Sequence, residues 1–393
     1  MRRQNVAHTI ERIPYGFRFK NETGTRDAYG GTTDYVVLEA QLVRPVDHES
    51  DTLIVFMHPV LTGAYLPIIG ALAKAGHHIL VASSRYRGND AALLMEKVVQ
   101  DLGESIKFAK KRLGYSKIVL GGWSGGGSLS AFYQQQATNP TLTSSPSGDG
   151  PDLTKAELPP ADAIMLVAAH GSRHGTLTQC LDASILDESD PTVRDASLDI
   201  YGTEVSPPYS QEFLERYFAA QIARNRKITA WVKEKLAAIK ASDRPQDEHC
   251  FVVHGTMGDP RWLDPTIDPN GREPGVSYLG PPQEVNEGPF GLARFTSLRS
   301  WLSQWSYDDA RGDGIACSRD LTVPALVVGN LNDEICTPAH THGLYEAVGS
   351  ADKELYEIPD ANHYYLGEGQ DVPLAKAVEI TDDWLKRHGF AGA

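Results

Sequence analysis

The sequence predicts an α/β protein in which a mostly parallel sheet is flanked by helices. Short, almost wholly apolar runs recur along the chain, which is typical of strands covered on both faces. Segments with apolar residues every three or four positions lie between these runs, as expected of helices. Strands that alternate with helices form parallel sheets, because each helix returns the chain to the start of the next strand.

The expected strands and helices follow one another in order. Residues 34–45 are rich in β-branched side chains and end at a proline, which indicates a strand. Six shorter apolar runs are also expected to be strands: 52–57, 78–82, 117–121, 161–168, 324–329 and 354–358. Helical patterns cover residues 94–113 and 129–136 and begin again near Ala339 and Pro373.

Two segments interrupt this alternation. Residues 139–160 are rich in Pro, Ser, Thr, Gly and Asp, so we expect an exposed loop. Between residues 171 and 314 the strand pattern disappears, and helical patterns cover residues 211–241, as one helix or a broken pair, and about 291–308. Four of the six tryptophans fall in this block, which we therefore expect to be a folded, mainly helical insertion.

Composition excludes several classes of function. The chain has 37 basic and 51 acidic residues, and a net charge of −14 disfavours a nucleic acid partner. The apolar runs are too short to span a bilayer, and no apolar segment of a signal peptide follows Arg2 and Arg3. The four cysteines form no C-x-x-C pair, as is typical of reduced thiols. We therefore expect a cytoplasmic protein without a membrane partner.

The strongest chemical motif is G-x-S-x-G, which spans residues 122–126 with Ser124 at its centre. The motif directly follows an expected strand and opens an expected helix. In this context it indicates a nucleophile elbow, a sharp turn that lifts the serine hydroxyl above the sheet edge. A glycine-rich strand–helix turn without chemistry is the alternative. We interpret Ser124 as a nucleophile.

A serine nucleophile needs a base and an orienting acid, which should follow it in the order Ser, acid, His. His363 lies just past the expected strand 354–358 and is the predicted base. The loop after residues 324–329 holds two adjacent acids, Asp333 and Glu334. Asp333 is the predicted acid and Glu334 the alternative, with Asp182 and Asp187 as weaker rivals.

Acyl transfer also needs an oxyanion hole, because negative charge develops on the carbonyl oxygen. One donor should be the backbone N–H of Gly125, directly after the nucleophile. The second should come from the loop after residues 52–57, where Pro59 has no N–H. The backbone N–H of Val60 is therefore the predicted second donor, ahead of that of Leu61.

Together these features resemble the α/β-hydrolase superfamily, over about residues 34–171 and 314–393. The resemblance rests on His58-Pro59-Val60, the turn around Ser124, Asp333 and His363. It implies an eight-stranded, mostly parallel sheet and a triad of Ser124, His363 and Asp333. It also implies that the insertion after the sixth strand is a cap. We therefore expect a core of residues 1–170 and 315–393 and a cap of residues 171–314.

A core of this size is complete without the insertion, which is therefore expected to form a lid over Ser124. An aromatic-rich lid favours an apolar pocket for a bulky hydrophobic group, although most of its tryptophans are expected to form its own core. His58, Leu61, Trp123 and Tyr364 are expected to line the pocket.

The predicted function is hydrolysis of a small-molecule carboxylic ester or lactone with a bulky hydrophobic group, through an acyl-enzyme on Ser124. The alternatives are cleavage of a carbon–carbon or amide bond by the same triad, or a non-catalytic small-molecule receptor. No metal or organic cofactor is expected. The pairs His77/His78 and His340/His342 have no nearby third ligand and are predicted to lie at the surface. A homo-oligomer is an open alternative to a monomer.

Overall fold

The computed structural model describes residues 7–21, 26, 28 and 31–391. The prediction that the chain has no signal peptide concerns its first residues, and residues 1–6 lie outside this range. The strands are β1 Ile10–Lys20, β2 Tyr35–Pro45, β3 Thr52–His58, β4 Ile79–Ser83, β5 Lys117–Ser124, β6 Ala163–Ala169, β7 Cys250–Val252, β8 Phe295–Ser297, β9 Ala325–Asn330 and β10 Lys353–Ile358. The helices are α1 Pro67–Lys74, α2 Met95–Phe108, α3 Gly125–Thr138, α4 Arg173–Cys180, α5 Gln211–Lys240, α6 Pro282–Glu287, α7 Leu298–Ser300, α8 Gly314–Ser318, α9 Pro338–Ala347 and α10 Asp371–Arg387.

The main sheet has eight strands in the order β1-β2-β4-β3-β5-β6-β9-β10. β2 is antiparallel to both of its neighbours, and the pairs from β4 to β10 are parallel. β3, β5 and β6 are buried along almost their whole length, which accounts for their apolar sequences. The predicted fold class, an eight-stranded α/β sheet with a large insertion after the sixth strand, is confirmed.

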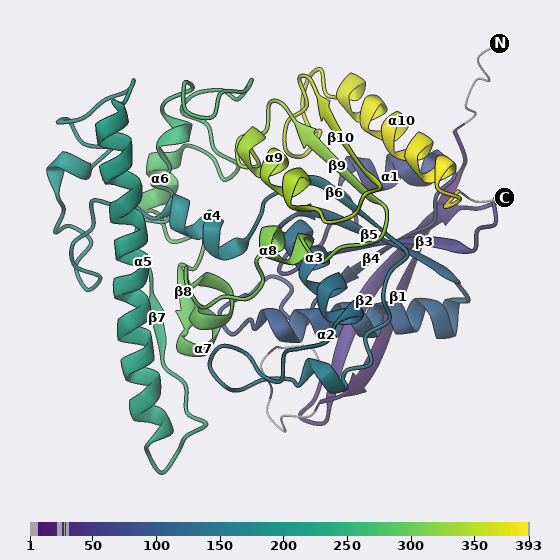
Figure 1. Ribbon diagram of the computed structural model, residues 1–393, viewed down its shortest axis with the longest axis horizontal. Coiled ribbons are helices and arrows are strands. Elements are labelled where there is room, and N and C mark those ends of the chain that lie inside the picture. Colours follow the sequence, from purple (N-terminus) through teal and green to yellow (C-terminus); the bar gives the residue numbers. More distant parts are fainter. Residues whose placement is uncertain (1–6, 22–25, 27, 29–30, 392–393) are drawn as a thin grey trace.

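Helices cover both faces of this sheet (Figure 1). α1 and α10 pack together on one face, where Ile69 and Trp384 belong to one apolar core. α2 and α3 cover the other face, where Val98 and Phe132 belong to a second core. Each core is continuous with buried side chains of the central strands, so the sheet edge at the end of β5 is held from both sides.

The insertion between β6 and β9 lies beside the sheet and is dominated by α5 (Figure 1). Residues 211–240 form one helix of 30 residues, begun by a hydrogen bond from the Phe213 N–H to the Ser210 hydroxyl. The expectation that strands are absent here is wrong, because β7 and β8 form an antiparallel ribbon. Each has only three residues, too few to produce a strand pattern in the sequence. The division into residues 1–170, 171–314 and 315–393 stays a prediction.

Three further expectations need correction. The helix expected over residues 291–308 is shorter, because β8 occupies residues 295–297 and only α7 and a π-helical turn, Trp301–Trp305, follow. The loop 139–160 is not exposed throughout, since Leu153 and Leu158 are buried in the core beneath α2 and α3. β1 was not among the strands expected from apolar runs, because this edge strand is half exposed and mixes charged residues with Pro14 and Gly16.

Cys180, Cys250, Cys317 and Cys336 are free thiols in the structure. Within the described residues, no helix combines the length and the apolar character needed to cross a bilayer.

Glu96 on α2 is fully buried where the insertion meets the core. One carboxylate oxygen accepts a hydrogen bond of 2.7 Å from the Ser303 hydroxyl, and the other has no partner among the described residues. Burial outweighs the effect of this bond and raises the pKa of Glu96 from 4.5 to about 7. The folded protein therefore holds a proton that the unfolded chain releases, and stability falls as pH rises from 4.5 to about 7.

We expect Glu96→Gln to be more stable than the wild type above pH 7, by about 3 kcal/mol, because the amide is neutral at every pH, whereas the carboxylate must take up a proton or be buried with its charge. The difference should shrink towards pH 4, and chemical denaturation at both pH values measures it. Glu379→Gln is the control, since that side chain is 70% exposed. A wild type as stable as Glu96→Gln at pH 8 would contradict the prediction.

Candidate active site

The side chains that could take part in catalysis lie together at the edge of the sheet where the parallel strands end. β3 ends at His58, β5 ends at Ser124, and His170 directly follows β6. Asp333 and His363 lie in the loops that follow β9 and β10. Ligands of open parallel sheets bind at this edge, so these residues define the candidate active site.

Ser124 occupies the sharp turn between β5 and α3, with φ 53° and ψ −127°. Such a conformation costs about 1–3 kcal/mol in a residue other than glycine, and it is typical of functional sites. A Cβ atom at Gly122 would lie 2.6 Å from the Cα atom of Gly127. A Cβ atom at Gly126 would lie 2.6 Å from the Met57 carbonyl oxygen, so both positions require glycine. The Ser124 hydroxyl forms no hydrogen bond with the part of the chain that the structure describes.

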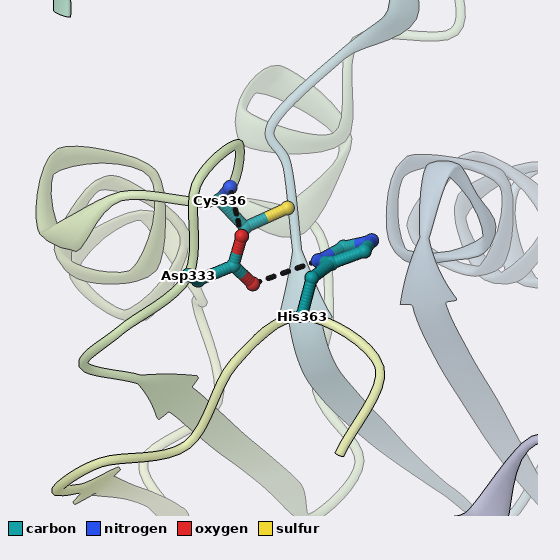
Figure 2. A group of neighbouring side chains, drawn as sticks. All are labelled: Asp333, Cys336 and His363. Carbon is teal, nitrogen blue, oxygen red and sulfur yellow. Dashed lines mark hydrogen bonds and ion pairs between the residues drawn. The ribbon is translucent and has the colours of Figure 1, made fainter. Parts of the chain in front are cut away.

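The predicted base and acid form a buried pair. His363 Nδ1 lies 2.7 Å from Asp333 Oδ2, and the two side chains are 1% and 0% exposed. Figure 2 shows the far edge of the imidazole, which carries Nε2, pointing away from the carboxylate. Burial lowers the pKa of His363, but the charge and hydrogen bond of Asp333, together with the charge of Glu334, raise it above 6.5. In the neutral imidazole, Nδ1 carries the proton and Nε2 is free to accept one.

The backbone fixes Asp333 for this contact. Its Oδ1 accepts hydrogen bonds from the N–H groups of Ile335, at 2.9 Å, and Cys336, at 2.7 Å. Glu334 forms no hydrogen bond with the His363 imidazole, and burial and the charge of Asp333 raise the pKa of Glu334. The structure therefore brings Asp333, and not Glu334, to the imidazole.

The two rival acids of the insertion have other partners. Asp182 is buried and accepts hydrogen bonds of 2.8 Å from Arg194 and from Asn286. Asp187 is exposed and binds Ser189 in its own turn. Neither carboxylate has a bond to His363 within the described residues, so the structure contradicts their assignment as the acid.

Aromatic side chains join the turn at Ser124 to the loop of His363. The Trp123 indole N–H donates to the His363 carbonyl oxygen at 3.1 Å, and the two rings lie 4.8 Å apart. The Tyr364 ring lies 5.4 Å from Trp123, and the His58 ring lies 6.0 Å from it. Of the four expected pocket residues, Trp123 and Tyr364 thus lie beside His363, and His58 lies beside Trp123. The fourth, Leu61, lies on the loop after β3 and is 46% exposed.

The predicted second oxyanion donor has another partner. The Val60 N–H donates to His58 Nδ1 at 3.1 Å, and the Leu61 N–H donates to the same nitrogen at 3.0 Å. Both groups are therefore engaged within their own loop, which contradicts the expectation that either is free for substrate. The sequence could not reveal this, because it depends on the orientation of the His58 ring.

Sequence reasoning missed two basic residues beside the site. Burial, together with Arg173 and His363, lowers the pKa of His170 to about 3, so its imidazole is neutral. Arg173 is also buried, and it is paired with Asp90 at 2.9 Å and stacked over the Trp305 ring. The position of His170 two residues after the apolar run 161–168 was the available signal, since strand ends face the site.

The prediction that the paired histidines lie at the surface is wrong for three of the four. His77 is buried against Asp382 at 3.1 Å, and His78 is buried against the Tyr115 hydroxyl at 2.7 Å. His340 is buried near Arg261, whereas His342 is exposed and binds Glu357. Composition could not distinguish these positions, because each buried histidine depends on a partner distant in sequence.

Asp333, Cys336 and His363 place three ligand atoms within 4.8 Å of one another (Figure 2). A metal would need the Cys336 thiolate. Burial, together with the charges of Asp333 and Glu334, raises the pKa of this thiol well above 9.0 and so disfavours the thiolate. The bond between Asp333 and His363 accounts for the proximity of the three side chains.

The insertion contacts the loop that carries Asp333. The Trp262 indole N–H donates to the Glu334 carbonyl oxygen at 2.7 Å, and the Asn270 amide donates to the Asp333 carbonyl oxygen at 2.7 Å. Trp262, Trp301 and Trp305 are buried in apolar clusters formed mainly by the insertion. These tryptophans stabilise the insertion, which in turn holds the Asp333 loop.

Comparison with known proteins gives limited sequence similarity. No model of a known protein family matches this chain. Two curated Escherichia coli proteins, each described as an uncharacterized 31.7 kDa protein in the traX-finO intergenic region, are 40% identical to it over 65 residues. The match covers 16% of this chain and about a fifth, 22%, of the length of those relatives.

Solved structures align over most of the chain at low identity. The esterase domain of a Rhodothermus marinus protein has a TM-score of 0.45 and 14% identity, and the alignment covers 95% of this chain and 98% of that one. The siderophore hydrolase EstB from Aspergillus fumigatus has a TM-score of 0.45 and 12% identity, with 89% and 94% covered. The proline iminopeptidase of Mycobacterium smegmatis has a TM-score of 0.43 and 15% identity, with 88% and 95% covered.

The sheet topology of this chain identifies its fold without these alignments. Its sheet has one antiparallel second strand, a crossover between β3 and β4, and a serine in a strained turn between the fifth strand and the next helix. A buried acid–histidine pair follows at the ends of the last two strands. Together these features make up the α/β-hydrolase fold, which this chain has.

Proposed function

We propose that this chain is a serine hydrolase that cleaves a carboxylic ester or lactone through an acyl-enzyme on Ser124. One observation carries the proposal: a buried His363–Asp333 pair with a distance of 2.7 Å lies at the same sheet edge as a serine held at φ 53°. A receptor has no need of a strained serine or of a histidine oriented by a buried carboxylate.

The proposed reaction begins with proton transfer from the Ser124 hydroxyl to His363 Nε2 as the serine oxygen attacks the carbonyl carbon. Asp333 keeps the Nδ1 proton in place and stabilises the imidazolium. The Gly125 N–H binds the developing oxyanion. Collapse of the tetrahedral intermediate breaks the ester bond, and the leaving alkoxide takes the proton from His363. A water molecule then attacks the acyl-enzyme by the same route, releasing the acid and restoring Ser124.

We further propose that the substrate carries a bulky hydrophobic group. The exposed Leu61 side chain and the Trp123 and Tyr364 rings beside His363 support a contact with such a group. Trp262, Trp301 and Trp305 of the insertion do not contribute, because they are buried in apolar clusters formed mainly by the insertion. The insertion as a lid over Ser124 remains a proposal, supported by its contacts with the Asp333 loop.

A substrate panel tests the bond class. We expect p-nitrophenyl esters and aromatic lactones to be hydrolysed faster than the matching anilides, with an initial burst of nitrophenol equal to one per enzyme. Longer acyl chains should be preferred to acetate if the apolar contact is correct. Faster turnover of an anilide or of a β-diketone than of any ester would favour the amide or carbon–carbon alternative. Binding of esters without any turnover would favour the receptor.

A further inference from the structure

The His58 side chain bridges its own loop and the backbone beside the nucleophile. His58 Nδ1 accepts the N–H groups of Val60 and Leu61, at 3.1 and 3.0 Å. A ring nitrogen that accepts hydrogen bonds carries no proton, so the neutral imidazole must carry its proton on Nε2. This network fixes the tautomer: Nε2 is a donor.

The loop after β3 is held rigidly in this arrangement. The Pro59 carbonyl oxygen accepts a hydrogen bond from the Ser84 hydroxyl at 2.5 Å, and the Val60 carbonyl oxygen accepts one from the Gly88 N–H at 2.9 Å. The first bond fixes the peptide plane that contains the Val60 N–H, and the second fixes the plane that follows it. Turning that N–H towards Ser124 would break its bond to His58 and strain both anchors. The two backbone donors that the sequence predicts, the N–H groups of Val60 and Leu61, are therefore both engaged in this state.

The Nε2 atom of His58 faces the residue that follows the nucleophile. A Cβ atom built on Gly125 would lie 2.8 Å from His58 Nε2 and 3.3 Å from His170 Nε2. The Nε2–H group thus approaches the backbone whose own N–H is the expected first oxyanion donor. Within the described residues, His58 Nε2 has no hydrogen-bond partner. An unpaired donor beside Gly125 is what an oxyanion hole requires.

Electrostatics keeps His58 in the neutral, donating form. Burial is the main cause that lowers the pKa of His58 well below 6.5, and the charge of Arg173 lowers it further. The imidazole therefore does not compete with His363 as a base at neutral pH, because its only free nitrogen already carries a proton.

We propose that His58 Nε2–H is the second oxyanion donor of this site, in place of the backbone N–H of Val60. The Nδ1 side of the ring accepts the loop N–H groups, and the Nε2 side donates to the carbonyl oxygen as it becomes negative. The inference rests on the proposed serine hydrolase function. It also explains why residue 125 is a glycine, since a side chain at this position would displace the His58 donor.

Two substitutions separate the donor role from the loop-holding role. Asparagine places a carbonyl oxygen near the position of Nδ1, so His58→Asn keeps the acceptor for Val60 and Leu61 but lacks the Nε2–H donor. Glutamine places an amide N–H near the position of Nε2, so His58→Gln keeps the donor but lacks the loop acceptor. His342→Asn is the matched control, because that side chain is 48% exposed.

We expect His58→Asn to lower kcat for p-nitrophenyl butyrate by about 10²–10³-fold, with a similar fall in the rate of fluorophosphonate labelling. KM and the melting temperature should stay close to those of the wild type. His58→Gln should recover at least about tenfold of the lost kcat despite a lower melting temperature.

Two results would overturn the inference: a kcat of His58→Asn within about threefold of the wild type, or a kcat of the glutamine variant no higher than that of the asparagine variant. Ser124→Ala, measured in parallel, separates this inference from the proposed function. If Ser124→Ala is inactive while His58→Asn is fully active, only the role of His58 fails. If Ser124→Ala retains turnover, the proposed function itself fails.

Discussion

Ser124→Ala is expected to lower the rate of ester hydrolysis by about 10³–10⁶-fold, because the covalent route disappears and only binding and oxyanion stabilisation remain. The fold should be unaffected. The Ser124 side chain makes no capping hydrogen bond to α3, and alanine meets the same backbone strain at φ 53°. Steady-state rates measured beside thermal unfolding of both proteins test the two statements together.

Ser116→Ala is the matched control, since the same change is made at an exposed serine whose hydroxyl bonds to Asp51. It should retain wild-type turnover. Residual turnover in Ser124→Ala comparable to that of Ser116→Ala would mean that Ser124 is not the nucleophile.

Asp333→Asn is expected to lower kcat by about 10⁴-fold, because the amide would hold His363 in the wrong tautomer. Two backbone N–H groups, of Ile335 and Cys336, face Oδ1 and would select the amide oxygen there. The amide NH₂ would then face His363 Nδ1 and donate to it. The proton of the neutral imidazole would move to Nε2, which could no longer accept the proton of Ser124.

The pH profile gives Asp333→Asn a second readout. His363 must be neutral to act, and Asp333 raises its pKa above 6.5 against the effect of burial. Wild-type kcat/KM should therefore fall as pH drops through a midpoint above 6.5, and the residual activity of Asp333→Asn should have a lower midpoint. Glu334→Gln is the comparison, expected to change kcat far less. A larger loss in Glu334→Gln than in Asp333→Asn would reassign the acid.

Much of this architecture could be predicted from the sequence, because the signals are local. β3, β5 and β6 are buried on both faces, so their apolar runs identify them without knowledge of the fold. Ser124 is recognisable because the turn demands glycines at fixed spacing, and His363 because chain order places it after a strand. Asp333 and Glu334 could not be separated from sequence, since the choice depends on which carboxylate the backbone of Ile335 and Cys336 orients.

What the sequence could not predict depends on contacts between distant segments. The orientation of the His58 ring redirects the Val60 N–H, and no local pattern encodes that bond. His170 faces the site only because β6 lies beside β5 in the sheet. β7 and β8 are recognisable as strands only once they pair, since three residues carry no periodic signal.

The most direct test of the central claim is the intact mass of the wild type and of Ser124→Ala after exposure to a fluorophosphonate. The account predicts a single adduct on the wild type and none on Ser124→Ala, because only a serine activated by His363 and Asp333 attacks the phosphorus. No adduct on the wild type, or equal labelling of both proteins, would contradict it.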